Sequence, residues 1–245
     1  KMKKFSDKMI KRYFSENVKK LIEIGQGGTI HINLYDKINT NLMITSCWQD
    51  HCEIECSEDD LVTNIDYDKK SIQINSQSNK KNITNPIKIT IPEIFHVNLK
   101  ASDLQLKLSK KILGDVSIQC NSGFIEIDKL KGENISLDCG KADIKINTLV
   151  EGIKNSINSR KLNAQMINGK DVSIKSIEDA KIEAIYSDST TIKSDSLFLN
   201  LAFGKTSIST NQDVTVNNID GSFGIVSNNG NVSVQINKLF KGSIS

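Results

Sequence analysis

The sequence contains few prolines, aromatic residues and histidines, and it has no long apolar run. Its 245 residues include two prolines and three histidines, and aromatic residues make up 5% of the chain. With only His31, His51 and His96 present, few bases could activate a serine or cysteine nucleophile. No segment approaches the roughly 20 consecutive apolar residues of a membrane-spanning helix. We therefore predict a non-enzymatic protein with no catalytic residue, no cofactor and no transmembrane segment.

Charge is distributed unevenly along the chain. The formal net charge is +3, but residues 1–20 hold eight basic and two acidic side chains, so the remaining residues sum to −3. Nucleic-acid binding normally uses a basic face that carries stacking aromatic residues. A slightly acidic body with few aromatic residues therefore predicts no nucleic-acid partner.

The basic segment at residues 1–20 has the pattern of a short amphipathic helix. Four apolar residues are spaced by three or four positions, which places them on one stripe of such a helix: Met2, Phe5, Met9 and Tyr13. The order Arg12-Tyr13-Phe14-Ser15 is typical of a mitochondrial presequence cleavage site. We predict a mitochondrial protein on this basis. The alternative is a solvated helix on a cytoplasmic or secreted protein.

A repeated pair of short strands dominates the rest of the chain. Val116 and Ile118 recur as Ile135 and Leu137, nineteen positions later, and the alternation returns at Val172, close to two further periods on. Repeats of this length are typical of solenoids, whose coils bury their apolar edges against neighbouring coils. The pattern predicts an all-β solenoid with about 18–20 residues per coil.

The solenoid is expected to form a single domain over residues 21–245. Its first coils, at 21–110, are irregular, and its clearer repeats occupy 111–240. In the first part, alternating residues predict two strands around the glycine turn at 25–28. Further strands are predicted at Leu42–Ile44, Cys52–Cys56, Leu61–Ile65, Ser71–Asn75 and Ile87–Ile91.

Two stretches carry a resemblance to a known family. The first is Ile87-Lys-Ile-Thr-Ile-Pro-Glu, and the second runs from Gly114-Asp-Val-Ser-Ile to Asn121-Ser-Gly-Phe-Ile-Glu-Ile. Over about residues 20–240 the chain resembles the auto-transporter adhesin family, or head GIN domain, with its uncharacterised eukaryotic relatives. The resemblance implies a right-handed β-helix. It implies no established reaction and supplies no site residue.

One cysteine-rich segment offers a weak metal candidate. Cys47, His51, Cys52 and Cys56 are ligand types that zinc accepts. Their spacings differ from the paired Cys-x2-Cys pattern of zinc sites, and a strand would turn Cys52 and Cys56 inward. The five cysteines of the chain are an odd number, which favours reduced thiols. We predict buried core cysteines and no metal here.

The densest run of acidic residues is a candidate interaction patch. It consists of Glu53, Glu55, Glu58, Asp59 and Asp60. Such a run could dock a basic partner, although a solvated loop is the more frequent explanation. On the later strands, by contrast, acidic residues alternate with lysines, which indicates a charge-balanced surface.

These features favour an interaction or scaffold protein that binds a protein partner through a ladder face or an open end of the solenoid. The alternative is a secreted or surface adhesin that binds glycans, in which the glycosylation patterns at Asn82, Asn134 and Asn231 would be used. A third reading is a polysaccharide-active β-helix enzyme, which would need clustered carboxylates.

Overall fold

The computed structural model describes residues 18–35, 40–56, 61–76 and 86–244, and these ranges contain fourteen strands and no helix. The strands are β1 (Val18–Glu23), β2 (Gly28–Leu34), β3 (Thr40–Cys47), β4 (His51–Cys56), β5 (Leu61–Asp66), β6 (Ser71–Ser76), β7 (Ile87–Pro92), β8 (Phe95–Leu113), β9 (Val116–Lys131), β10 (Asn134–Ser176), β11 (Asp179–Ser194), β12 (Ser196–Thr210), β13 (Val214–Ser227) and β14 (Val232–Ile244). In this part of the chain no helix could cross a bilayer. The helix predicted over residues 1–20 lies outside the described residues, except that β1 begins at Val18.

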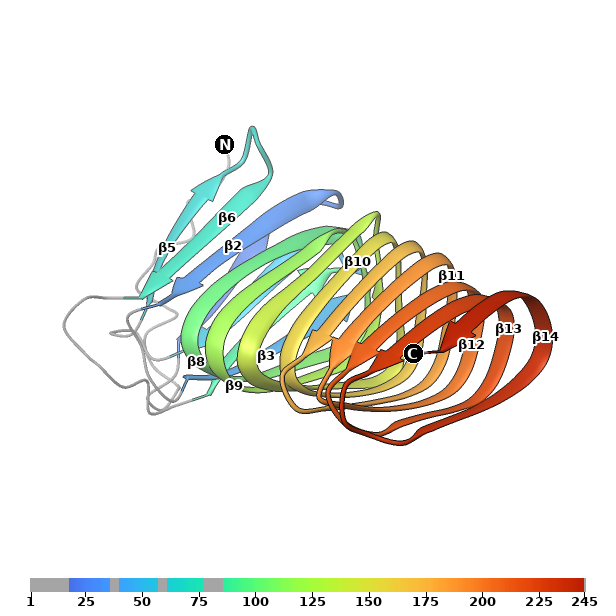
Figure 1. The fold of residues 1–245 in the computed structure, drawn as a ribbon. Helices are drawn as coiled ribbons and strands as arrows, with labels where there is room; N and C mark the ends of the chain where they lie inside the picture. Colours follow the sequence, from blue (N-terminus) through green and yellow to red (C-terminus); the bar gives the residue numbers. More distant parts are fainter. Residues whose placement is uncertain (1–17, 36–39, 57–60, 77–85, 245) are drawn as a thin grey trace, which may run out of the picture.

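From β8 onward the chain winds into coils that are stacked one behind the other in Figure 1. Each coil pairs in parallel with the next, so that Val97 pairs with Val116 and Val116 pairs with Ile135. The offset is nineteen positions there, and it falls to seventeen where Ala180 pairs with Leu197. The predicted all-β solenoid, with its repeat at Val116 and Ile135, is thus confirmed.

The core of the solenoid follows from the alternation of side chains along each strand, because successive residues point to opposite faces. Ile135 and Leu137 are at most 1% exposed, and their sequence neighbours Ser136 and Asp138 face outward. Burying an aliphatic side chain of this size contributes roughly 1.5–3 kcal/mol. The stack of such residues therefore supplies the main stabilising term of the coils.

Several core positions of the middle and later coils hold polar side chains instead of apolar ones. Asn155 is buried, and buried serines follow at Ser159, Ser176 and Ser194. The Asn155 Nδ2 donates to the carbonyl oxygens of Gly152 and Asn168, at 3.2 and 2.9 Å. The Asn155 side chain thus occupies a core position by means of hydrogen bonds to the backbone, and the apolar sequence repeat is interrupted at this residue.

The corners of the coils are built by glycines and by aspartates. Gly204 has a φ of +98°, and a methyl group at this position would overlap the carbonyl oxygen of Ser187 in the preceding coil. At another corner, the Asp115 Oδ1 accepts the amide hydrogens of Glu133 and Asn134, at 2.9 and 2.8 Å. Side chain and backbone thereby tie one coil to the next.

Before β8 the regular winding gives way to two arms. The first half of β8 pairs with β2, which leads to β6 and β5, and we call these three strands the hairpin arm. The second half of β8 pairs with β3, which leads to β7, β4 and β1, the second arm. The β5–β6 hairpin projects from the body in Figure 1. The two strands predicted around the glycine turn, β1 and β2, therefore belong to different arms.

Candidate functional site

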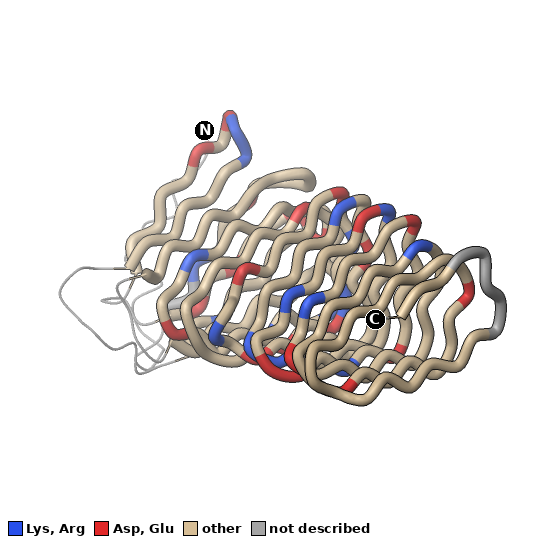
Figure 2. The backbone as a smooth tube through the Cα atoms, in the orientation of Figure 1, with Lys and Arg blue, Asp and Glu red and all other residues tan. Residues whose placement is uncertain are grey.

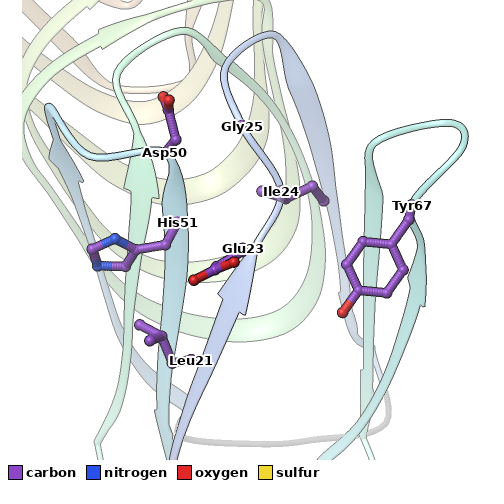
Figure 3. Close-up of a pocket in the computed structure, with 7 residues that line it drawn as sticks. All are labelled: Leu21, Glu23, Ile24, Gly25, Asp50, His51 and Tyr67. Carbon is purple, nitrogen blue, oxygen red and sulfur yellow. The ribbon is translucent and has the colours of Figure 1, made fainter. Parts of the chain in front are cut away.

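An open cavity of about 420 Å³ lies between the arms at the N-terminal end of the solenoid, and Figure 3 shows the residues that line it. We call it the N-terminal cleft. Its lining comes from β1 and the turn after it, from the β3–β4 connection and from the tip of the β5–β6 hairpin: Leu21, Glu23, Ile24, Gly25, Asp50, His51 and Tyr67. Three segments that are distant in the sequence thus meet at one place.

Backbone hydrogen bonds fix the relative positions of these segments. The amides of Ile24 and Gly25 donate to the carbonyl oxygen of Asp50, at 3.2 and 2.9 Å, which joins β1 to the β3–β4 connection. The Lys70 Nζ donates to the carbonyl oxygen of Gln26 at 3.1 Å, which ties the hairpin tip to the glycine turn. The cleft is therefore held by contacts on both of its sides.

The cleft combines acidic groups with exposed apolar surface. Glu23 and Asp50 contribute carboxylates, and no lysine or arginine lies among the described residues that line the cleft. Tyr67 is 62% exposed and Leu21 58%, so both offer apolar surface to a ligand. A ligand that carries both positive charge and apolar groups is complementary to such a surface.

A second exposed aromatic residue, Trp48, lies two positions before the cleft residue Asp50 in the sequence. Trp48 belongs to the same β3–β4 connection as Asp50 and is 83% exposed. The Lys111 Nζ lies 6.0 Å from the centroid of its ring, within the range of a cation–π contact. Exposed tryptophan and tyrosine residues are the types most enriched in the energetic centres of protein interfaces.

The cysteine-rich segment has the geometry of a core strand. Cys52 is fully buried, as the alternation of β4 predicts, and burial together with the nearby Cys47 and Glu53 raises the pKa of its thiol to about 12. The Cys47 Sγ donates to the carbonyl oxygens of Gln49 and His51, at 3.7 and 3.8 Å. Within the described ranges, no three metal-ligand side chains come together. The candidate set of Cys47, His51, Cys52 and Cys56 thus gains no geometric support.

The acidic interaction patch lies partly outside the described residues, at Glu58, Asp59 and Asp60. The other two carboxylates have partners: Glu53 lies 3.4 Å from the His51 Nε2, and Glu55 lies 3.6 Å from the Lys88 Nζ. Both glutamates lie on β4, between β1 and β7. The use of the whole patch in binding stays a prediction.

Several carboxylates on the regular coils lie close to lysines or arginines, and Figure 2 shows acidic and basic positions intermixed along the coils. Glu126 lies 3.5 Å from the Lys107 Nζ and 3.6 Å from the Lys145 Nζ. A hydrogen bond from the Asn147 Nδ2, together with these lysines, holds its pKa below the usual range. Glycosidase chemistry needs one carboxyl group that stays protonated near neutral pH, and Glu126 does not meet that requirement.

The remaining candidate nucleophiles and bases serve the fold. The His96 Nδ1 accepts the amide hydrogen of Asp115 at 3.0 Å, and the His31 Nδ1 lies 3.4 Å from the Asn98 Nδ2. Hydrogen bonding with Cys120, followed by burial, raises the pKa of Cys139 far above that of a reactive thiol. These side chains are thus engaged in contacts between coils.

Comparison with known proteins finds distant structural neighbours and no sequence match. No family model and no curated protein matches the chain. Among solved structures, a "putative adhesin" from Parabacteroides distasonis has 9% identity and a TM-score of 0.43, covering 93% of this chain and 95% of its own. A "putative adhesin" from Parabacteroides merdae has 16% identity and a TM-score of 0.39, covering 94% and 96%.

A third structure, a "putative lipid binding protein" from Parabacteroides distasonis, has 11% identity and a TM-score of 0.41, with 94% of this chain and 97% of its own covered. Two of these three neighbours have names that include the word adhesin, which also names the family that the sequence resembles. Likeness at this level concerns the fold alone. The mitochondrial location stays a prediction.

Sequence reasoning missed the N-terminal cleft. Glu23, Asp50 and Tyr67 have no common motif, and they approach one another only through the pairing of the arms. The sequence offered one indication of the cleft. Large side chains such as Tyr67 stand in polar connections between strands, where they do not belong to the predicted core.

Proposed function

We propose that this protein is a non-enzymatic interaction module that binds a protein partner at the N-terminal end of the solenoid. One observation carries the proposal. The described sheet ends there in two strands, β1 and β5, each with a single neighbour, and the N-terminal cleft opens between the arms that hold them.

A strand with one neighbour presents a row of backbone N–H and C=O groups that an incoming segment can pair with. Strands β9 to β13, by contrast, are paired on both sides within the stack. A partner that adds a strand therefore has a geometric reason to bind at the arms and not on the sides of the coils.

The lining of the cleft indicates which partner segments fit. Glu23 and Asp50 favour a lysine or arginine side chain, and the ring of Tyr67 offers a surface for the apolar stem of that side chain. We expect the bound segment to be extended, with a basic residue flanked by β-branched residues.

The chemistry of the described residues supports a binding role over an enzymatic one. The buried thiols of Cys52 and Cys139 have raised pKa values, so they are not thiolates at neutral pH. Glu126 and Asp143 are paired with basic side chains. A partner held by contact alone requires none of these groups to react.

Selection of peptides from a random 15-residue display library on the full chain tests the proposal. We expect enriched peptides to combine β-branched residues with a lysine or arginine. Titration calorimetry of the best peptide should show that the double variant Glu23→Gln, Asp50→Asn weakens binding at least tenfold. Asp188→Asn, an exposed aspartate on the regular coils, is the matched control and should leave binding unchanged.

A binding site elsewhere would give a different pattern. If the enriched peptides bind the double variant as tightly as the natural chain, the N-terminal cleft is not their site and the proposal fails. If Tyr67→Ala also leaves their affinity unchanged, the hairpin tip plays no part in recognition.

A further inference from the structure

A second hollow lies on the side of the regular coils. It has a volume of about 300 Å³ and is formed by residues of β9, β10 and β11. We call it the lateral groove. Its side chains include one aromatic ring, three lysines, an aspartate and an asparagine: Phe124, Lys145, Lys161, Lys181, Asp143 and Asn163.

The aromatic ring gives the lateral groove an apolar surface. Phe124 occupies an outward position on β9, is 38% exposed and pairs with Asp143 of the next coil. The groove is also lined by Ile144 and Leu162, which are only 2% exposed. An exposed aromatic face of this kind stacks against the C–H groups on one side of a sugar ring, because the face of the π-system carries partial negative charge.

Three of the charged side chains around the ring are held in place by ion pairs. Asp143 accepts two hydrogen bonds from Arg160, at 2.8 and 2.7 Å. The Lys145 Nζ lies 3.6 Å from Glu126, and the Lys161 Nζ lies 3.2 Å from Glu178. An ammonium group has three N–H donors and a carboxylate about four acceptor positions, so these contacts leave capacity for a ligand.

The lateral groove carries charges of both signs. Its lining holds three lysines and two aspartates, Asp143 and Asp179, and Lys181 is also 3.9 Å from Glu183. A polyanion or a polycation would gain little from such a field. A neutral molecule with many hydroxyl groups fits better, because each hydroxyl both donates and accepts.

We propose that the lateral groove binds a neutral pyranose chain, with one sugar ring stacked on Phe124 and its hydroxyl groups bonded to Asp143, Asn163 and Lys181. This site is separate from the N-terminal cleft and does not depend on the function proposed for it. It would make the protein a carbohydrate-binding solenoid as well as a protein-binding one.

The direction of the bound chain follows from the stacking of the coils. Asn163 pairs with Lys181, and Lys181 pairs with Phe198, whose ring centroid lies 5.7 Å from the Lys181 Nζ. Neighbouring coils are about 4.8 Å apart, close to the length of one sugar residue in a 1,4-linked chain. A chain that runs along the solenoid axis beside Asn163, Lys181 and Phe198, which are register partners on successive coils, would therefore place about one sugar residue on each coil.

Titration calorimetry with the full chain tests the proposal. The ligands are neutral hexasaccharides of 1,4-linked glucose, N-acetylglucosamine, xylose and mannose, with hexagalacturonate as the charged counterpart. We expect at least one neutral hexasaccharide to bind, and Phe124→Ala to weaken that binding at least tenfold. Asn163→Lys, which fills the groove with a longer side chain, should weaken it to a similar degree.

Phe203→Ala is the matched control, because Phe203 is an exposed ring, 50% accessible, outside the lateral groove. It should change the Kd by less than twofold, and circular dichroism should show that all variants keep the fold. The proposal is overturned if none of the neutral hexasaccharides binds. It is also overturned if hexagalacturonate binds more tightly than all of them and Lys145→Gln, not Phe124→Ala, removes that binding.

Discussion

The regular coils and the N-terminal arms use the same alternation of apolar and polar residues, yet they leave different groups available. In the coils from β9 to β13, each strand pairs in parallel with a neighbour on both sides. The arms contain antiparallel pairs, such as β1 with β4 and β5 with β6, and end in strands with one described neighbour. Backbone pairing is therefore saturated in one region and open in the other.

This difference indicates where the two regions can interact with other molecules. The coils can offer only side chains, as in the lateral groove around Phe124. The arms offer backbone groups as well, next to a cleft with exposed Tyr67 and Leu21. In our proposal the regular stack supports the arms, and the departure from regularity provides the open edges for strand addition.

The largest effect is expected from a methyl group at a corner of the coils. Gly204→Ala would place this group against the carbonyl oxygen of Ser187 at a φ of +98°. We expect the free energy of unfolding to fall by about 3 kcal/mol or more, because backbone strain and overlap add. Denaturant unfolding followed by circular dichroism measures it.

Gly27→Ala in the N-terminal region is the control for this variant. Gly27 also has a positive φ, of +76°, but a methyl group there would meet no atom within 4 Å. The cost should be about 1 kcal/mol, from conformation alone. Equal losses in the two variants would show that close stacking of the coils does not require glycine at Gly204.

An intermediate effect is expected at the buried side chain of Asn155. Asn155→Ala removes the donor that satisfies the carbonyl groups of Gly152 and Asn168, and we expect a loss of about 1–3 kcal/mol. Ser159→Ala in the same coil should be neutral or slightly stabilising, because the buried Ser159 Oγ has no hydrogen-bond partner among the described residues. Thermal unfolding of both variants checks the contrast, and a Ser159→Ala loss as large as that of Asn155→Ala would contradict it.

A smaller, pH-dependent effect is expected at Asp115. Partial burial would raise the pKa of this carboxyl group, but hydrogen bonds from the amide and side chain of Asn134 and the amide of Glu133 outweigh it and hold the pKa below the usual range. Its stabilising contribution is therefore present above the unfolded pKa of about 3.9 and is lost as the pH falls through the folded value.

Asp115→Asn should remove about 1 kcal/mol at pH 7 and less at pH 3, where the natural chain has itself begun to lose the contribution. Unfolding curves at the two pH values measure this, with Asp171→Asn at an exposed position as the control. A loss that is the same at both pH values would mean that the charge of Asp115 contributes nothing.

The sequence was sufficient to predict the coils because their structure is local in character. The recurrence of Val116 as Ile135 predicts both the repeat length and the parallel register. In the structure these two residues are register partners on neighbouring strands. The strand predicted at Cys52–Cys56 was also found, with Cys52 and Ile54 inside. Alternation alone identifies such strands and the faces that they bury.

Alternation does not identify the partner of an irregular strand. β1 precedes β2 in the chain, yet it pairs with β4 in the other arm, and no residue of β1 specifies that choice. The N-terminal cleft depends on this pairing, because Glu23, Asp50 and Tyr67 meet only once the arms are placed. The lateral groove likewise needs the register that sets Phe124 beside Asp143. Both sites were therefore hidden from sequence reasoning.

The contrast between saturated coils and open arms is tested most directly by hydrogen–deuterium exchange of the full chain, read by mass spectrometry. The account predicts that amides of β9 to β12 exchange slowest, and that amides of β1 (Val18–Glu23) and β5 (Leu61–Asp66), which have one described neighbour each, exchange faster. If β1 and β5 are protected as strongly as β10, their outer edges are already covered, and the N-terminal end is not an open site for a partner.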